Sequence, residues 1–207
     1  MYKLYYSPGS ASVAAQAVLE ETGAPYQLEL VDVSQGQHKT AAYLKINPTG
    51  KVPALSLDNG VTISESAGLC IFLADSHPQA GLAPAIDDPK RGAYLQWLMY
   101  LTNTLQPADL RFYYSERYTA AAGDVANVKQ QAQIEVATCW TRIDTHLAEH
   151  GPYLLGDRFS AADIFCWMLS TWQDCCPKLY ERFPHVKKLA ELVAARPAIQ
   201  RVQKANS

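Results

Sequence analysis

The chain has 207 residues, of which 48% are hydrophobic and 18% charged, enough apolar material for one large domain or two small ones. Its formal net charge of -2 argues against a nucleic-acid-binding protein, because such proteins usually carry a basic surplus. No apolar run approaches the roughly 20 residues of a membrane span, and residues 1–8 lack the pattern of a signal peptide, so we expect a cytoplasmic protein.

The first 76 residues or so alternate between short extended and short helical runs. We expect a strand over residues 3–6, a helix over 12–22 that stops at Gly23, a strand over 26–33, a loop over 34–40 and a short helix before Asn47-Pro48. A hairpin follows, in which residues 54–57 and 61–63 flank a turn whose Asn59-Gly60 supplies positive φ angles. Ser64 is expected to cap the next helix, which ends near Ser76.

This order, β-α-β-α-β-β-α, implies a parallel strand pair from the first β-α-β unit and an antiparallel pair from the hairpin. A four-stranded mixed sheet with three helices is the thioredoxin arrangement. The predicted fold is therefore an α/β thioredoxin-like N-terminal domain followed by an all-α C-terminal domain.

The second half lacks strand patterns. Residues 77–89 are rich in proline, glycine and aspartate, as a linker is. Long helical segments are expected over residues 89–118, 123–150, 160–172 and 186–196. We predict a first domain over residues 1–77, a linker over 78–89 and a helical domain over 90–207.

The five cysteines form no spaced framework, and an odd number predicts reduced thiols. Cys70 and Cys166 lie in apolar helical runs, where cysteine packs as a small hydrophobic residue. Cys175 and Cys176 are adjacent, but no second pair of ligands is near them, so no metal site is expected. Packing is the expected role of this pair, with redox chemistry as the alternative.

The stretch Lys51-Val52-Pro53-Ala54 precedes a predicted strand. Proline cannot donate a ladder hydrogen bond, and X-Pro bonds tolerate the cis form. A cis bond at Val52-Pro53 would turn the Val52 N–H and C=O outward, where an extended peptide pairs with them like an added strand. A trans proline that starts an edge strand is the alternative, and this motif alone does not decide between them.

Two further stretches offer charged and polar groups for a ligand. Glu65 and Ser66 stand at a helix start, where free N–H groups bind a carboxylate, the serine adds a hydroxyl and the glutamate takes an ammonium group. The alternative is a capping serine with a glutamate that favours the helix dipole. In the loop 36–39, His38 and Lys39 are suited to a second carboxylate, or are simply solvated.

Three hydroxyl side chains, those of Tyr6, Ser10 and Ser12, surround the link between the first strand and the first helix. A hydroxyl at a helix N-terminus donates to a thiolate, and the helix dipole also favours the anion, so a bound thiol becomes a stronger acid. The alternative is that Ser10 or Ser12 caps the helix.

Ser160 and Asp163 have the spacing of a capping box and are interpreted as structural.

The whole chain resembles the cytosolic glutathione transferases. The resemblance rests on residues 46–55, on Ser64-Glu65-Ser66 and on residues 156–163, which occur in the family's order and spacing. It implies glutathione as co-substrate, a homodimer and a role in detoxification. The implied glutathione site consists of Val52 and Pro53 for the cysteinyl backbone, Glu65 and Ser66 for the γ-glutamyl end, and His38 with Lys51 for the glycyl carboxylate.

The subclass is mixed. Residues 5–10 are similar to the bacterial beta class and to the serine-using delta and theta classes, and residues 36–38 resemble theta-type members. The beta class has a cysteine where this chain has Ala11 and a histidine where it has Gln106, so a mixed disulfide with glutathione is not expected in this loop. The delta-like alignment makes Ser10 the catalytic residue, with Tyr6 and Ser12 as the alternatives.

The implied reaction is attack of the glutathione thiolate on a small hydrophobic electrophile. Lowering a thiol pKa from about 8.5 toward about 6.5 requires about 2.7 kcal/mol, which one hydrogen bond to a charged group plus a helix end supplies. Candidate residues of the electrophile pocket are Gln106, Tyr113, Tyr114 and Trp172. Two other functions stay open: a glutathione-binding or protein-interaction module without turnover, and a glutathione-dependent disulfide or peroxide reductase.

Overall fold

The computed structural model describes residues 1–206, which form two compact units. One consists of Met1–Ala85 together with the residues from Ala194 onward, and the other of Ile86–Val193. The change of unit falls inside the segment 78–89 that the sequence assigns to a linker. The last helix belongs to the first unit and not, as the sequence suggests, to the helical half.

The first unit is built on a four-stranded sheet with the order β2-β1-β3-β4. Its strands are β1 (Tyr2–Tyr6), β2 (Tyr26–Leu30), β3 (Ala54–Ser56) and β4 (Thr62–Ser64). Strand β1 runs parallel to β2 and antiparallel to β3, and β3 and β4 form the antiparallel hairpin. Leu4 pairs with Leu28 on one side and Leu55 on the other, and the Leu4 and Leu55 side chains are fully buried. The predicted mixed thioredoxin-like sheet is confirmed.

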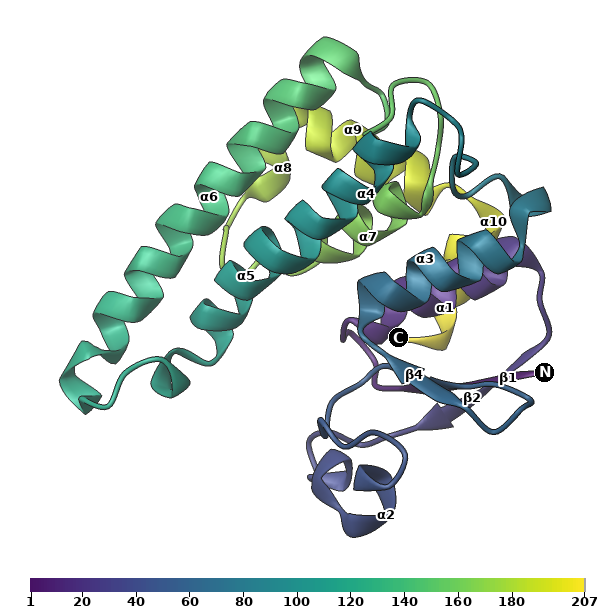
Figure 1. The fold of residues 1–207 in the computed structure, drawn as a ribbon. Helices are drawn as coiled ribbons and strands as arrows, with labels where there is room; N and C mark the ends of the chain where they lie inside the picture. Colours follow the sequence, from purple (N-terminus) through teal and green to yellow (C-terminus); the bar gives the residue numbers. More distant parts are fainter. Residues whose placement is uncertain (207) are drawn as a thin grey trace. The chain divides into compact units, whose positions relative to one another are not determined.

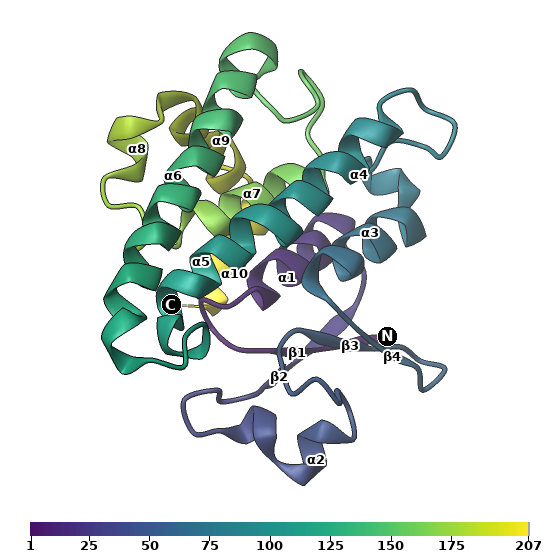
Figure 2. The same ribbon diagram turned by 60° about the vertical axis from the view of Figure 1, so that its left-hand side comes forward.

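Helices cover both faces of this sheet (Figures 1 and 2). Helices α1 (Ser12–Thr22) and α3 (Ser66–Ser76) lie side by side on one face, and α2 (Ala41–Leu44) lies on the other side. Helix α1 has the predicted bounds and ends where Gly23 takes a φ of 69°, its N–H donating to the Leu19 carbonyl. Every side chain from Val13 to Leu19 is buried, and all of them except that of Gln16 are small or aliphatic.

Helix α10 (Pro197–Ala205), which the sequence did not predict, packs against α1. Arg196 donates two hydrogen bonds to Glu21, at 2.6 and 2.7 Å, and Arg201 donates one to Glu20. Proline at the first helical position suits the start of a helix, because the missing N–H is one that a helix leaves free in any case.

The predicted cap of α3 was wrong. Ser64 is the last residue of β4 and pairs with Ala54, so it lies in the sheet and not at the helix end. Glu65 separates the strand from α3 with a φ of 71°, and its side chain makes no capping hydrogen bond. The chain turns through a backbone conformation that non-glycine residues seldom adopt.

The second unit is helical: α4 (Arg91–Tyr100), α5 (Gln106–Tyr113), α6 (Val125–His150), α7 (Ala161–Ser170), α8 (Leu179–Arg182) and α9 (Pro184–Ala194). The helix expected over residues 89–118 is interrupted by a π-helical turn, Leu101–Leu105, and α5 ends at Tyr113. Pro107 accounts for the wide turn, because its ring crowds the carbonyl four residues earlier and it has no N–H to donate. Short 3₁₀ turns occur at Gln37–Lys39, Pro78–Ala80, Ser115–Arg117 and Ala122–Asp124.

The start of α7 carries the predicted capping box, which is confirmed. Asp163 accepts a hydrogen bond from the Ser160 N–H at 2.8 Å and another from the Leu154 N–H at 2.7 Å. All of α7 is buried, including Phe165 and Trp167. The box therefore fixes the start of the central helix of this unit.

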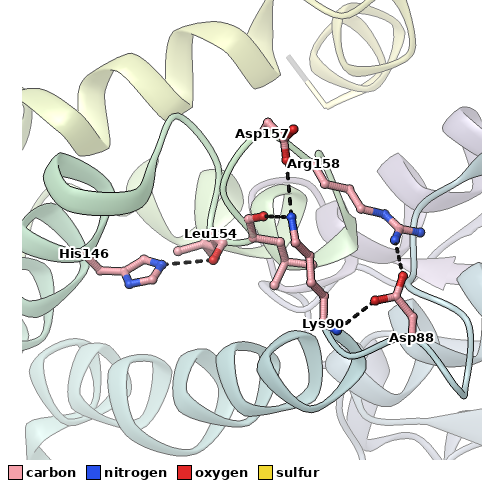
Figure 3. Close-up of polar contacts among 7 residues, drawn as sticks. Asp88, Lys90, His146, Leu154, Asp157 and Arg158 are labelled. Carbon is pink, nitrogen blue, oxygen red and sulfur yellow. Dashed lines mark hydrogen bonds and ion pairs between the residues drawn. The ribbon is translucent and has the colours of Figure 1, made fainter.

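A polar network ties residues 88–90 to residues 154–158 within the second unit (Figure 3). Arg158 pairs with Asp88 at 2.7 Å, and the Lys90 ammonium donates to the Leu155 carbonyl at 3.0 Å and pairs with Asp157 at 3.3 Å. His146 on α6 contacts the Leu154 carbonyl through Nε2 at 3.0 Å. These cations and carboxylates satisfy one another, so the network is structural.

Among residues 1–206, no helix has the length and apolar character needed to cross a membrane.

Candidate functional site

The sheet brings three of the predicted motifs to one edge of the first unit. Strand β1 ends at Tyr6, and because β3 runs antiparallel to it, Ala54 pairs with Tyr5 at the same edge. Val52-Pro53 immediately precedes β3, and β4 ends there at Ser64, opposite Ala54. The loop 7–12, the Val52-Pro53 bond and the start of α3 are therefore neighbours, although they lie far apart in the sequence.

The loop between β1 and α1 forms a compact group of hydroxyls and backbone atoms. The Ser10 hydroxyl lies 2.7 Å from the Ser7 carbonyl, to which it donates, and 2.8 Å from the Ser12 hydroxyl. Ser12 also reaches the Ser7 carbonyl, at 3.0 Å, and accepts from the Ser7 N–H at 3.2 Å. Both hydroxyls thus donate to the same carbonyl. Ser10 can therefore turn its proton to another acceptor while the Ser7 carbonyl keeps the hydrogen bond from Ser12.

The three candidate hydroxyl residues differ in exposure. Ser12, the first residue of α1, is fully buried, whereas Ser10 and Tyr6 are half-buried. Ser10 also accepts from the Ser12 N–H at 3.2 Å, so its oxygen partly caps the helix as the alternative interpretation expected. Of the two serines at this helix end, Ser10 is the accessible one.

The Val52-Pro53 peptide bond is cis. The Lys51 carbonyl just before it accepts hydrogen bonds from the Tyr43 hydroxyl and from the Asn47 side-chain amide, both at 2.7 Å. The Val52 main chain forms no hydrogen bond with the part of the chain that the structure describes. Its N–H and C=O are therefore available to an extended ligand, while two largely buried side chains hold the residue beside them.

Glu65 and Ser66 take different positions at the start of α3. Glu65 is exposed and has a positive φ, a conformation that costs on the order of 1–3 kcal/mol for a non-glycine residue and is concentrated at functional sites. Ser66 is largely buried, and its hydroxyl donates to the Ala11 carbonyl at 2.6 Å. The Ser66 hydroxyl proton thus joins α3 to the loop before α1, and the free donors at this place are the first N–H groups of α3.

The cations of the candidate site lie around Gly50. The Lys39 ammonium donates to the Gly50 carbonyl at 3.0 Å, and a Cβ at Gly50 would meet that nitrogen and the His38 carbonyl at 3.0 and 3.1 Å. Gly50 also has a φ of 59°, so only glycine fits without displacing Lys39. His38 is half-buried and Lys51 is exposed.

The sequence did not identify Tyr43 and Asn47 as residues that hold the site, and it offered Lys39 for a ligand carboxylate, whereas the Lys39 ammonium donates to the Gly50 carbonyl. The available signal was Asn47-Pro48 close to Gly50, since an asparagine before a turn usually bonds neighbouring backbone. No local pattern indicates that Lys39 reaches the carbonyl of Gly50, eleven residues further along the chain. These three residues bond backbone carbonyls and so shape the loop, and do not add ligand-binding groups to it.

The four candidate residues of the electrophile pocket all belong to the second unit. The rings of Tyr113 and Trp172 meet edge to face, with centroids 6.4 Å apart. Burial, followed by the nearby Asp174, raises the pKa of Tyr113 to about 12, so this phenol is neutral at physiological pH. Tyr114 lies under the Arg117 guanidinium at 3.9 Å, and Gln106, the first residue of α5, accepts from Thr102 at 3.3 Å.

The five thiols are all free and buried. Burial raises the pKa of every one of them, that of Cys70 to about 12. A buried, protonated thiol is a poor nucleophile. Among residues 1–206 there is also no cluster of three or more histidine, cysteine, aspartate or glutamate side chains arranged to hold a metal ion.

Comparisons with known proteins agree with this architecture. The model of the glutathione S-transferase N-terminal domain matches residues 12–76, and that of the C-terminal domain matches residues 108–205. Glutathione S-transferase 3 of Zea mays is 32% identical over 96% of this chain and 91% of its own length. A disulfide-bond oxidoreductase of Escherichia coli is 29% identical over 96% of this chain and 92% of its own.

A solved structure is also similar over nearly the whole chain. The glutathione transferase homologue from Sulfitobacter, crystallised with bound glutathione, superposes with a TM-score of 0.92. It is 29% identical, over 99% of this chain and 98% of that one.

Proposed function

Because this chain belongs to the glutathione S-transferase family, we propose that it joins the glutathione thiolate to a small hydrophobic electrophile, with Ser10 stabilising the thiolate. The assignment to Ser10 rests on the arrangement of the two serine hydroxyls in the loop 7–12 and on their difference in exposure. Ser10 is half-buried at the N-terminus of α1, whereas Ser12 is fully buried behind it.

Glutathione is held as an extended peptide along the edge at which the motifs gather. Val52 pairs with the cysteinyl backbone, beside Pro53. The γ-glutamyl end carries an ammonium and a carboxylate on one carbon, which suit Glu65 and the N–H groups that begin α3 at Ser66. His38 and Lys51 are the candidates for the glycyl carboxylate. The unused hydrogen bonds of the Val52 main chain and the positive φ of Glu65 support this arrangement.

The hydroxyl pair provides a proton arrangement suited to an anion. When a thiolate approaches, the Ser10 proton turns from the Ser7 carbonyl to the sulfur, and the Ser12 proton stays with that carbonyl or moves to the Ser10 oxygen, 2.8 Å away. A donor to the Ser10 oxygen makes the Ser10 hydroxyl a stronger donor in turn. Ser12 is thus a positioning residue, and Ser10 is the residue that contacts the sulfur.

The chemical step is a displacement or an addition. The glutathione thiol first loses its proton to solvent. The sulfur then forms a bond to the electrophilic carbon, and a halide or similar group leaves with the bonding pair, or a conjugated double bond accepts the pair and is later protonated. The aromatic side chains Tyr113 and Trp172, with Tyr114 and Gln106, are proposed to line the electrophile pocket.

Titration of bound glutathione tests the role of Ser10, with the ultraviolet absorbance of the thiolate as the signal. We expect Ser10→Ala to raise the pKa of the bound thiol by about 2 units, Ser12→Ala to raise it by about 1 unit, and Tyr6→Phe to leave it unchanged. A shift for Tyr6→Phe as large as that expected for Ser10→Ala would move the assignment to Tyr6. Glutathione affinity measured on the same variants separates loss of the thiolate from loss of binding.

A second function is favoured by one relative, the disulfide-bond oxidoreductase of Escherichia coli. A glutathione-dependent reductase of disulfides or peroxides would here have to use the thiol of glutathione itself, because the protein thiols are buried and protonated. Glutathione attacks the disulfide, one thiol leaves, and a second glutathione resolves the mixed disulfide. Parallel assays with a chloronitrobenzene-type electrophile and with a small disulfide distinguish the two reactions, and retention on glutathione resin without either turnover indicates a binding module.

Family membership also supports a homodimer. Helix α4 leaves little apolar surface for a dimer contact, because Tyr94 and Leu98, like Leu101 just after the helix, are buried. Met99, 40% exposed, is the large apolar side chain of that helix that stays at the surface. Sedimentation at micromolar concentration tests the proposal, and a monomer there rules it out.

A further inference from the structure

Asp109, on α5, is a buried carboxyl group to which the proposed reaction assigns no role. Its exposed fraction is 1%, and neither oxygen forms a hydrogen bond of normal geometry within residues 1–206. The Cys175 thiol lies beside it, but a thiol is a weak donor. A carboxyl in this position is costly when it is ionised, because nothing replaces the water that solvated it.

Among residues 1–206, no cation pairs with Asp109. Its neighbours are Tyr113 from its own helix, Cys139 from α6, and Cys175 and Cys176 from the segment after α7. The charged side chains next in reach act on those neighbours: Asp174 on Tyr113, Arg111 and Glu135 on Cys139, and Lys129 on Cys175. Arg111 is already paired with Glu135, and Arg182 donates to the Cys176 sulfur at 3.1 Å. Lys129 lies over the Phe112 ring, 4.4 Å from its centroid.

The side of Asp109 next to Cys175 is closed by an irregular segment, residues 171–178, between α7 and α8. Cys175 and Cys176 are each 1% exposed. Within the segment, the Cys176 N–H donates to the Gln173 carbonyl at 3.1 Å, and Lys178 has a left-handed φ of 59°. The segment is also held by the edge contact between Trp172 and Tyr113. Such short non-helical segments open locally more easily than the helices they join.

We propose that Asp109 is a proton-controlled latch of this segment. While it is protonated, residues 171–178 close over it and hold Trp172 against Tyr113. When it ionises, water must reach the carboxylate, so the segment opens and uncovers Cys175 and Cys176. Asp109 is in this sense a positioning residue for the Tyr113–Trp172 pair.

The proton balance gives the direction of the effect. Burial raises the pKa of Asp109 to about 8 in the closed form, whereas a solvated aspartate titrates near about 3.9. Opening therefore releases a proton once the pH exceeds the solvated value. The open population grows by at most about tenfold for each pH unit between about 4 and about 8, and becomes independent of pH above that range.

Amide hydrogen exchange tests the latch on the full chain, without glutathione or electrophile. The rates for residues 171–178 are compared between the wild type and Asp109→Asn at the same pH, so that base catalysis of exchange cancels. We expect the wild-type to variant ratio to rise with pH from 5.5 to 8, by up to about tenfold per unit, and to level off above pH 8.

Thiol modification provides a second measurement on the same samples. Cys175 and Cys176 are alkylated with iodoacetamide and located by mass spectrometry, with Cys166, buried in α7, as the internal control. We expect Cys175 and Cys176 to react faster in the wild type than in Asp109→Asn at pH 8. In a closed segment the opposite order is expected, because an ionised Asp109 suppresses the neighbouring thiolate. If the variant folds poorly, the wild-type rates of Cys175 and Cys176 relative to Cys166 still carry the pH dependence.

Two results overturn the proposal. A wild-type to variant exchange ratio that is constant from pH 5.5 to 9 means that Asp109 does not control opening. The same pH slope for the α7 amides and for Cys166 means that Asp109 acts on the whole unit and not on the segment. Either result leaves the proposed role of Ser10 unaffected, because neither measurement involves glutathione.

Discussion

Asp109 and Asp163 are two carboxyl groups buried in the same helical unit, one on α5 and one at the start of α7. They have nearly the same exposed fraction, 1% and 0%. Asp163 accepts hydrogen bonds from the Leu154 N–H, the Ser160 N–H and the Ser160 hydroxyl. Asp109 accepts none of normal geometry within residues 1–206.

The pKa values follow this difference. Burial raises both, to about 6 for Asp163 and to about 8 for Asp109. The donors around Asp163 stabilise its carboxylate and offset part of the desolvation cost, while the thiol beside Asp109 offsets little. Equal burial therefore produces a structural cap in one region and a proton-sensitive group in the other.

The largest expected effect is that of Asp163→Ala. It removes the acceptor of two buried backbone N–H groups, and we expect the free energy of unfolding to fall by about 3 kcal/mol. Urea denaturation followed by circular dichroism measures this loss. Asp163→Asn keeps one acceptor oxygen and serves as the matched control with a smaller loss; equal losses would mean that the hydrogen bonds contribute little.

Asp109→Asn is expected to change stability in the opposite direction, by on the order of 2 kcal/mol at pH 8. The folded-state pKa of Asp109 is raised, so its contribution to stability is full below about pH 4 and is lost as the pH rises to about 8. Asparagine does not ionise, so the stability of the variant does not fall with pH on account of this position. Unfolding curves at pH 5, 6.5 and 8 should diverge progressively, and parallel curves would contradict the assignment.

A smaller effect is expected where a nearly buried carboxylate has a cation. The Glu21 side chain is 9% exposed and is paired with Arg196, whose side chain is 35% exposed. Arg196→Met leaves Glu21 without its partner and weakens the attachment of α10 to α1, at a cost of about 1–2 kcal/mol. Denaturation at pH 7 provides the value, and hydrogen exchange in α10 should show where stability is lost.

The smallest effect is expected for a fully solvated pair. Lys187 and Glu191 are one helical turn apart on α9, 3.7 Å from each other, with side chains 52% and 66% exposed. Lys187→Met should change the free energy of unfolding by no more than about 0.5 kcal/mol. A change as large as that of Arg196→Met would show that burial does not determine how much each ion pair contributes to stability.

Part of the candidate site was predictable from local sequence. The Val52-Pro53 dipeptide, the Glu65-Ser66 helix start and the serines of the loop 7–12 were all identified, because each is a short motif with its own chemistry. The supporting roles were not: Tyr43 and Asn47 were not identified, and Lys39 was expected to bind a ligand carboxylate. Tyr43 and Asn47 act on the Lys51 carbonyl, and Lys39 acts on the carbonyl of Gly50, through contacts that no local pattern encodes.

The sequence by itself determined the order of elements in the first 76 residues, the bounds of α1, the hairpin at Asn59-Gly60 and the capping box of α7. Helix periodicity, turn residues and caps act over a few neighbouring positions, so a chain displays them before it folds. Only the tertiary structure decided which hydroxyl is accessible, that Ser66 donates to Ala11, and that Asp109 is buried without a partner. Burial and pairing depend on residues brought together from distant parts of the chain, and each of these three facts has that origin.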